Sequence, residues 1–558
     1  MSNRTLPMML GFVAVLMVAV VAVMAVVVLS DSDGDAPAAP GTDPNGQPAD
    51  TGVSPGGFCE DSFLRLQGAE PPTSLDPIQV RDTIAAEIVV EIFGGLVSLD
   101  LDLNVIPDLA EDWDISADGT VYTFRLRDNA RFHNGTRVTA QDVKFSLERA
   151  ADPENASPTV LTYLRSIEGL EERFRNQADE ISGVQVIDES TIQITLTEPR
   201  DWFLKELTYP VAFVVDRQQI ERDPRGWIRQ PNGTGPYRMV EFSPGQRILL
   251  QANDHYHLGE PSLERVVIEL AGGSIMTRYE NDEIHIGFVP AIELEAIQGG
   301  TSPLSQDYTP QPQLSLFYLA FNVNEEPFDD PLVRQALAMA IDRERINDVL
   351  FFGTQRVADG ITPPGIRGQD DSVSSYPYDP GRARELLAES SYADGVPRVI
   401  LTFSGGGASP PDLLTAVQSM WREELGIDVE LQQVDWAAFL RELRTGSFQA
   451  YQTGWAADYP DPENFVDKLF AADSPQNELG YENPEVQAII EEARTELDSE
   501  RRFQLLAEAE QMILDDAVVI PLIWPVSHQL VKPCVQNWPE IPMIVPRYRY
   551  VEIDPGAE

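Results

Sequence analysis

Segments with strand and helix patterns alternate along the chain from about residue 60 onward. Residues 63–66 are predicted to form a strand, and residues 83–92 a helix, because Ile84, Ile88 and Ile92 recur on one helical face. Residues 113–127 predict a hairpin, whose second strand alternates polar and apolar side chains. Strands that interleave with helices in this way predict an α/β class with mixed sheets. The 558 residues are too many for one core, so two or three packed domains are expected.

Several helix starts can be read directly from the residues that precede them. Thr139 with Asp142 three positions later has the pattern of a capping box. Asp330, Asp379 and Asn483 are each followed by proline, which is the pattern of an N-cap residue with proline at the first helical position. The sequence therefore predicts helices that begin directly after these four cap residues.

The N-terminal region differs in composition from the rest of the chain. Residues 6–29 carry no charge and follow Arg4, and the run is long enough to span a bilayer with its C-terminal side outward. We expect residues 1–30 to be an uncleaved transmembrane anchor, with a cleaved signal segment as the alternative. No cysteine directly follows the run, which argues against a lipid anchor. Residues 31–58, rich in Asp, Pro and Gly, are expected to be a disordered linker.

The charge balance is strongly acidic. The chain has 90 Asp and Glu against 40 Lys and Arg, which gives a formal net charge of −50. Such a surface repels phosphates, so binding to nucleic acid or to anionic lipid headgroups is disfavoured. A GC-rich genome and adaptation to high salt both remain as explanations for the arginine-rich, acidic composition.

Two cysteines, Cys59 and Cys534, stand near opposite ends of the chain. A pair of this kind in an exported protein favours a disulfide, and two unpaired thiols are the alternative.

The sequence carries little sign of catalytic or metal chemistry. It has no zinc-protease helix motif, no nucleophile elbow and no phosphate-binding loop motif. His255 and His257 have a spacing that could hold a metal, but their surroundings favour a surface turn before a strand. We therefore expect no enzyme activity, no cofactor and no metal.

A set of longer segments resembles one protein family, the bacterial extracellular solute-binding proteins of family 5, the dipeptide, oligopeptide and nickel type. The first and longest group of these segments begins at residue 91 and ends in a Phe-His-Asn-Gly segment (132–135) and a Thr-Ala-Gln-Asp-Val segment (139–143). The resemblance covers roughly residues 60–550. Its segments are 91–97, 105–113, 116–127, 132–135, 139–143, 233–237, 321–322, 327–334, 340–343 and 454–462.

The resemblance implies a two-lobed periplasmic-binding-protein fold, similar to type II, with an extra subdomain in the N-terminal lobe. Lobe I is expected over 59–310 and 521–558, and lobe II over 311–520, with a hinge at the crossovers near 311 and 520. This topology places Cys59 and Cys534 in one lobe, which supports their pairing.

The resemblance also implies a function. The protein is expected to be the extracytoplasmic binding component of an ABC-type importer, a monomer that captures short peptides and delivers them to permease and ATPase subunits. A binding protein for oligosaccharide or another neutral solute is the first alternative. An enzyme or a ligand sensor on the same fold is the remote one.

The ligand-binding residues expected from the resemblance are Asp458, Trp455, Trp436, Tyr459 and Glu70. Asp458 ends a Trp-x-x-Asp motif, and a buried ligand ammonium group needs such an anionic partner. The two tryptophans would form apolar walls, which suits a site that accepts many side chains. Turn capping by Asp458, core packing by the tryptophans and simple solvation of Glu70 are the alternatives. Some oligopeptide binders carry Arg where this chain has Gln452, so the partner of the ligand carboxylate is not assigned.

Overall fold

The computed structural model describes residues 58–59, 62–68, 71–405 and 410–557. The expected anchor, almost all of the expected linker and Glu70 lie outside these residues. Within the described ranges, no helix combines the length and the apolar character needed to cross a bilayer.

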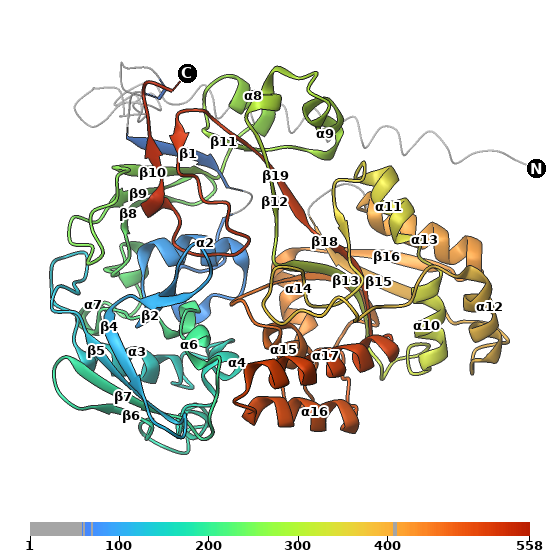
Figure 1. Cartoon of the computed structure of the whole chain (residues 1–558), viewed down its shortest axis with the longest axis horizontal. Helices are drawn as coiled ribbons and strands as arrows, with labels where there is room; N and C mark the ends of the chain where they lie inside the picture. The colour runs from blue at the N-terminus through green and yellow to red at the C-terminus, as the bar shows by residue number, and fades with distance from the viewer. Residues whose placement is uncertain (1–57, 60–61, 69–70, 406–409, 558) are drawn as a thin grey trace, which may run out of the picture. The chain divides into compact units, whose positions relative to one another are not determined.

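Lobe I is built on two four-stranded sheets (Figure 1), with strand orders β1-β10-β9-β8 and β4-β5-β7-β6. β1 and β10 are parallel, and the other pairs are antiparallel. The first sheet consists of β1 (Phe63–Gln67), β8 (Tyr237–Ser243), β9 (Arg247–Ala252) and β10 (Arg265–Glu269). The second consists of β4 (Ala110–Ile115), β5 (Val121–Leu126), β6 (Val184–Val186) and β7 (Thr191–Thr195).

The second sheet of lobe I illustrates how the sequence pattern becomes a core. On β5, Tyr122, Phe124 and Leu126 are buried, as their alternation predicts. They pack against the apolar stripe of α3 (Ala140–Ala150). Short elements complete this lobe: η1 (Pro77–Gln79), β2 (Val97–Leu99), β3 (Val105–Pro107), α4 (Val160–Leu164), α5 (Leu170–Phe174), α6 (Phe203–Glu206), η2 (Pro210–Ala212), α7 (Arg217–Arg222) and η3 (Trp227–Arg229).

The first sheet of lobe I is covered by α2 (Thr83–Ile92). Ile88, Val89 and Ile92 lie in one hydrophobic cluster with side chains of β8, β9 and β10. Asp82 caps this helix by accepting a hydrogen bond from the backbone N–H of Ala85 at 2.9 Å. The start of α2 is therefore held at a defined position at the edge of the lobe.

Lobe II is built on one six-stranded mixed sheet of order β14-β18-β13-β17-β15-β16. Alternate residues of β13 face opposite sides: Leu316 and Tyr318 join one hydrophobic cluster, and Leu319 and Phe321 join the other. Helices cover both faces, which explains the continuous apolar run in β13. The strands are β13 (Ser315–Phe321), β14 (Arg356–Val357), β15 (Val399–Ser404), β16 (Val429–Val434), β17 (Ala450–Ala456) and β18 (Val519–Trp524).

The helices of lobe II form two groups. Residues of α10 (Pro331–Met339), α11 (Arg343–Leu350), α12 (Pro380–Glu389) and α13 (Asp412–Leu425) share one cluster with the sheet. Residues of α14 (Trp436–Leu443), α15 (Glu463–Phe470), α16 (Pro484–Thr495) and α17 (Ser499–Asp515) share the other.

A three-stranded sheet of order β11-β19-β12 connects the two lobes (Figure 1). β12 (Tyr308–Pro312) enters lobe II, and β19 (Val526–Val531) leaves it. β18 continues in the sheet of lobe II to Trp524, a few residues beyond the expected crossover at 520. The third strand of this sheet is β11 (Ile286–Phe288). In the chain it follows α8 (Ile275–Glu280), and it is separated from β12 by α9 (Ala291–Gln298) and η4 (Pro303–Gln306).

The C-terminal segment returns to lobe I and is joined there by a disulfide between Cys59 and Cys534, across 475 positions of sequence. The pairing expected for the two cysteines is therefore present. The segment ends with β20 (Val535–Gln536), η5 (Tyr548–Tyr550) and β21 (Glu552–Ile553), and Tyr548 packs in the cluster of the first sheet.

The local predictions agree with the structure in most places. The strand over 63–66, the helix over 83–92 and the hairpin are confirmed as β1, α2 and β4–β5. The capping box is present at the start of α3, and each of the three predicted pairs, at Asp330, Asp379 and Asn483, starts a helix. The expected turn is present at both His255 and His257, and His255 is exposed. His257 is buried rather than at the surface, and its Nε2 lies 2.6 Å from Oδ1 of Asp108, a partner far away in sequence.

Candidate functional site

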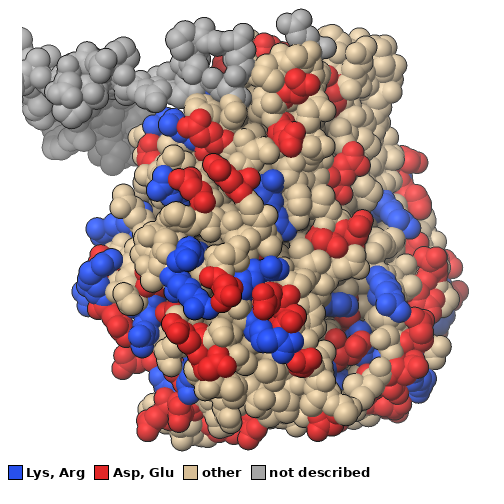
Figure 2. Space-filling view, turned by 60° about the vertical axis from the view of Figure 1, so that its left-hand side comes forward, with Lys and Arg blue, Asp and Glu red and all other residues tan. Residues whose placement is uncertain are grey.

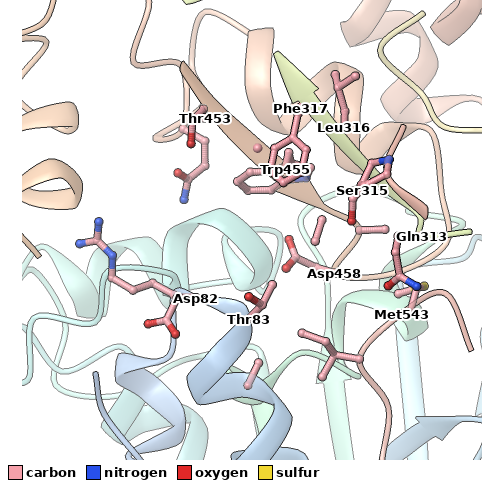
Figure 3. Close-up of a pocket in the computed structure, with 18 of the residues that line it drawn as sticks. Asp82, Thr83, Gln313, Ser315, Leu316, Phe317, Thr453, Trp455, Asp458 and Met543 are labelled. Atoms are coloured by element: carbon pink, nitrogen blue, oxygen red, sulfur yellow. The ribbon is translucent and has the colours of Figure 1, made fainter. Parts of the chain in front are cut away.

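A cavity of about 810 Å³ lies between the two lobes and is the candidate ligand site (Figure 3). Lobe I contributes the start of α2 and residues of α4. Lobe II contributes β13, α14 and β17, and the C-terminal segment adds Met543. The volume lies within the range of pockets that enclose small organic ligands.

Asp458 follows β17 and points into the cavity beside Trp455 (Figure 3). Its Oδ2 accepts hydrogen bonds from Tyr163 Oη at 2.5 Å and from Asn464 Nδ2 at 3.3 Å. Burial raises the pKa of Asp458 to about 6, while these two hydrogen bonds act in the opposite direction because they favour the carboxylate. Among the described residues, no Lys or Arg forms an ion pair with it. The site therefore holds a carboxylate that can receive a cation.

The two expected tryptophans both line the cavity. Trp455 lies on β17, and its Nε1 donates a hydrogen bond to Oδ1 of Asn464 at 3.1 Å. Because Oδ1 of Asn464 also accepts the backbone N–H of Asp458 at 3.0 Å, one side chain orients both predicted residues. Trp436 is the first residue of α14, and its ring stacks near that of Phe439, with centroids 6.0 Å apart.

β17 and β13 bring their backbones close together at the cavity wall. Gly454 pairs with Phe317, and a Cβ added at Gly454 would lie 2.6 Å from carbons of the Phe317 ring. Glycine at this position is therefore required for the ring to lie across the strand. Phe317 is 40% exposed and lines the cavity, as Trp455 does, so the apolar wall is broader than the sequence indicated.

Of the other two predicted residues, only Tyr459 is described, and it does not line the cavity. Tyr459 is 0% exposed and donates its hydroxyl hydrogen bond to Glu463 in the buried interior. Its side chain therefore supports the segment after Asp458. Glu70 lies outside the described residues.

Several cavity residues were not identified from the sequence. Tyr163 comes from α4 and reaches Asp458 across 295 positions, a contact with no local sequence signal. Gln452 lines the cavity where some oligopeptide binders have Arg, but Arg81 and Arg444 bring guanidinium groups to the same cavity from opposite lobes. Further charged lining residues are Asp82, Glu87, Glu478 and Arg547.

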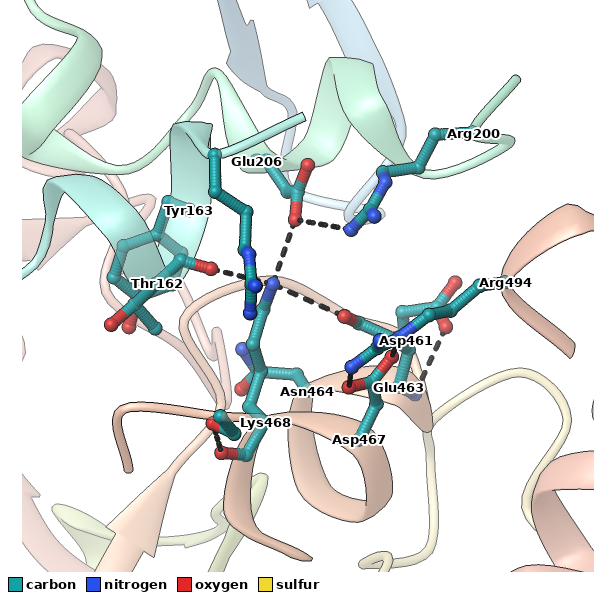
Figure 4. A network of polar contacts seen from close by, with 12 residues as sticks. Thr162, Tyr163, Arg200, Glu206, Asp461, Glu463, Asn464, Asp467, Lys468 and Arg494 are labelled. Carbon is teal, nitrogen blue, oxygen red and sulfur yellow. Dashed lines mark hydrogen bonds and ion pairs between the residues drawn. The ribbon is translucent and has the colours of Figure 1, made fainter. Parts of the chain in front are cut away.

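A buried network of charged groups connects the lobes next to the cavity (Figure 4). Lys468 of α15 donates hydrogen bonds to the backbone oxygen of Thr162 at 2.7 Å and to Glu206 at 2.8 Å, both in lobe I. It also lies 3.1 Å from Glu463. Asp461 is paired with Lys205 of lobe I, and both oxygens of Asp461 accept from Arg502 at 2.8 Å. These contacts fix the segment that carries Asp458 against lobe I.

Comparison with known proteins gives consistent results. The family model described as bacterial extracellular solute-binding proteins, family 5 Middle, matches residues 104–477. The periplasmic oligopeptide-binding protein OppA of Escherichia coli is 30% identical over 490 residues, covering 86% of this chain and 89% of OppA. The probable deoxycholate-binding periplasmic protein YgiS of Escherichia coli is 29% identical over 505 residues, covering 88% and 92%.

A solved structure shows that the likeness extends to the fold. The murein tripeptide binding protein MppA of Escherichia coli matches with a TM-score of 0.79 and 26% identity, covering 88% of this chain and 99% of MppA. The expected two-lobed α/β fold is thereby confirmed. The matched family model spans most of the chain, and the relatives align along nearly their whole length. The chain belongs to the bacterial extracellular solute-binding proteins of family 5.

Proposed function

We propose that the protein is the extracytoplasmic solute-binding component of an ABC-type importer and that its ligand is a short peptide. The observation that carries this proposal is the carboxylate of Asp458, which faces an interlobe cavity and has no ion pair with a Lys or Arg among the described residues. Lys468 acts on this carboxylate only through space. A peptide brings an α-ammonium group that can pair with it. The names of OppA and MppA, an oligopeptide and a tripeptide binder, support the same ligand class.

The proposed mechanism is capture without chemistry. Lobe I (59–310 and the segment after Trp524) and lobe II (311–524) rotate about the crossover strands β12 and β19 and enclose the ligand. Trp436 and Trp455 supply apolar contact area for variable side chains, while Asp458 fixes the N-terminal end of the peptide. The ligand shifts the equilibrium toward the closed form through its higher affinity for that form. The closed form then engages the permease, which separate ATPase subunits drive.

Calorimetric titration of the full-length chain with tri- to pentapeptides tests the proposal, in parallel with N-acetylated forms of the same peptides. We expect the free-amine peptides to bind, and N-acetylation or Asp458→Asn to weaken binding by about tenfold or more, because a charge-assisted hydrogen bond is lost. Asp394→Asn is a matched control, since Asp394 is exposed and does not line the cavity. Equal affinity for free and acetylated peptides would contradict the role of Asp458.

An oligosaccharide or another neutral solute is the second candidate, and the broad aromatic wall of Phe317, Trp436 and Trp455 favours it. A neutral ligand of this kind would bind with the same affinity to the wild type and to Asp458→Asn. An anionic ligand such as a bile acid would bind more tightly to the variant, because Asp458→Asn removes a like charge. The same titrations therefore separate the ligand classes.

The proposal includes the state of the protein at the membrane. Residues 1–30 attach the body to the cell membrane, and residues 31–58 link the two. Cell fractionation of the full chain and of a form with a cleavable signal peptide in place of residues 1–30 tests this. If only the second form is released from the membrane fraction, the result supports anchoring by residues 1–30.

The protein is also proposed to be a monomer without enzymatic activity. Light scattering of the protein in detergent tests the monomeric state. Recovery of the peptide unchanged after incubation with the protein tests the absence of catalysis.

A further inference from the structure

Two glutamates, Glu87 and Glu478, line the cavity from opposite lobes in addition to Asp458. Glu87 lies on α2, and Glu478 follows α15 in lobe II. Within the described part of the chain, neither carboxylate has a hydrogen bond or an ion pair. By accessible surface Glu87 is exposed and Glu478 is half-buried, so a ligand in the cavity can reach both carboxylates. Partial desolvation at the cavity wall raises the pKa of both, that of Glu478 to about 7. Both groups gain free energy if a ligand supplies a cation.

The arginines of the cavity do not provide that cation by direct contact. Arg547 acts on Glu87, and Arg81 and Arg444 act on Glu478, in each case through space. Nη2 of Arg81 already donates to the backbone oxygen of Leu440 at 2.9 Å. The α-carboxylate of a bound peptide would itself require one of these guanidinium groups, which leaves the glutamates with less compensation.

The charged side chains that line the cavity are three arginines and four acids: Arg81, Arg444 and Arg547 against Asp82, Glu87, Asp458 and Glu478, so the formal charge of the lining is negative. Asp82 caps α2 and accepts the hydroxyl of Thr73 at 2.5 Å, so its charge is already partly compensated by hydrogen bonds. Once the α-ammonium pairs with Asp458 and the α-carboxylate pairs with an arginine, Glu87 and Glu478 remain as acceptors. Acidic side chains are spread over the face of the molecule shown in Figure 2, and the formal charge of −50 on the whole chain attracts cationic ligands and repels anionic ones.

We propose that the cavity selects peptides that carry at least one Lys or Arg side chain, with Glu87 and Glu478 as the specificity-determining residues. This inference rests on the proposed function and narrows its ligand class. The two carboxylates come from different lobes, so a cationic side chain held between them also contributes to closure. The selectivity is a difference between ligand classes and does not require that neutral peptides be excluded.

The test compares alanine-based tri- and tetrapeptides that carry one Lys with the same peptides carrying Nε-acetyl-lysine or Glu at that position. Affinities for the full-length chain are measured by calorimetry. We expect the Lys peptides to bind about tenfold or more tightly than the acetyl-lysine peptides, and the Glu peptides to bind most weakly. In Glu87→Gln, Glu478→Gln or the double variant, the ratio of the affinities for Lys and acetyl-lysine peptides should fall toward one. The affinity of these variants for acetyl-lysine peptides should stay within about threefold of the wild-type value.

Glu423→Gln is the matched control, because Glu423 is an exposed acid of α13 outside the cavity. Its preference for Lys peptides should equal that of the wild type. Asp458-dependent binding of neutral peptides with no gain from Lys would overturn this inference and leave the proposed function intact. Failure of every peptide to bind would overturn both. A preference that persists in the double variant would assign the selectivity to other groups and overturn the role of the two glutamates.

Discussion

Tyr163 donates a hydrogen bond from its Oη to Oδ2 of Asp458 at 2.5 Å and thereby joins α4 of lobe I to the segment after β17 of lobe II. The ring of Tyr163 is itself stacked on that of Tyr209, with centroids 3.9 Å apart. The residue proposed to bind the ligand is thus part of the contact between the lobes. Its ionisation is coupled to the closed arrangement, because the bond favours the charged carboxylate.

Tyr163→Phe is expected to make peptide binding more sensitive to acid. The pKa of Asp458 is raised to about 6 by burial, and loss of the Tyr163 hydrogen bond would raise it further. Because the ammonium group pairs with the ionised form, affinity falls as pH drops through this pKa. Titrations between pH 5 and 8 should show the loss of affinity at a higher pH in the variant. Identical profiles for variant and wild type would contradict the coupling.

Asp458→Asn is expected to change the pH dependence of ligand-free stability. A carboxyl whose pKa is raised from 3.8 in the unfolded chain to about 6 destabilises the folded protein above pH 4, and fully so above pH 6. Between pH 4 and 7 the free energy of unfolding of the variant should therefore rise relative to wild type, by up to about 3 kcal/mol. Urea denaturation at several pH values measures this. Asp394→Asn, with its exposed carboxylate, should show no such trend.

Lys468→Met is expected to destabilise the protein strongly. The substitution leaves Glu206 and Glu463 buried without their shared cation. Removal of one member of a buried ion network costs about 3–5 kcal/mol. Arg501→Met is the control, since Arg501 pairs with Glu492 at the surface and should lose less than about 1 kcal/mol. Similar unfolding free energies for the two variants would show that the buried network adds little.

Reduction of the disulfide between Cys59 and Cys534 is expected to lower the melting temperature. The bond closes a loop of nearly the whole folded chain, and loss of such a link costs about 2–5 kcal/mol, chiefly by freeing the unfolded state. The double variant Cys59→Ser with Cys534→Ser should melt at the temperature of the reduced wild type and should not respond to reductant. No shift on verified reduction would contradict this prediction.

Prediction from the sequence was most successful where one short segment decides the outcome. The start of α2 depends on Asp82 and the residues directly after it, and the capping box of α3 depends on Thr139 and Asp142. Trp455 and Asp458 of the Trp-x-x-Asp motif both line the cavity, because they sit on one strand and the turn that follows, and their role in ligand binding stays a prediction. The side chain of the adjacent Tyr459 turns to the interior instead.

The sequence by itself determined the α/β class, the helix starts, the family and the segment that carries Asp458, since these follow from periodicity, local caps and continuous motifs. Only the tertiary structure decided which groups contact this carboxylate and which share its cavity. Tyr163 contacts Asp458 from a separate element, Glu87 and Glu478 line the same cavity from opposite lobes, and His257 is buried against Asp108 across 149 positions. Such neighbours are set by the packing of sheets and lobes, and the free energy of burying a charge depends on every group around it, not on sequence distance.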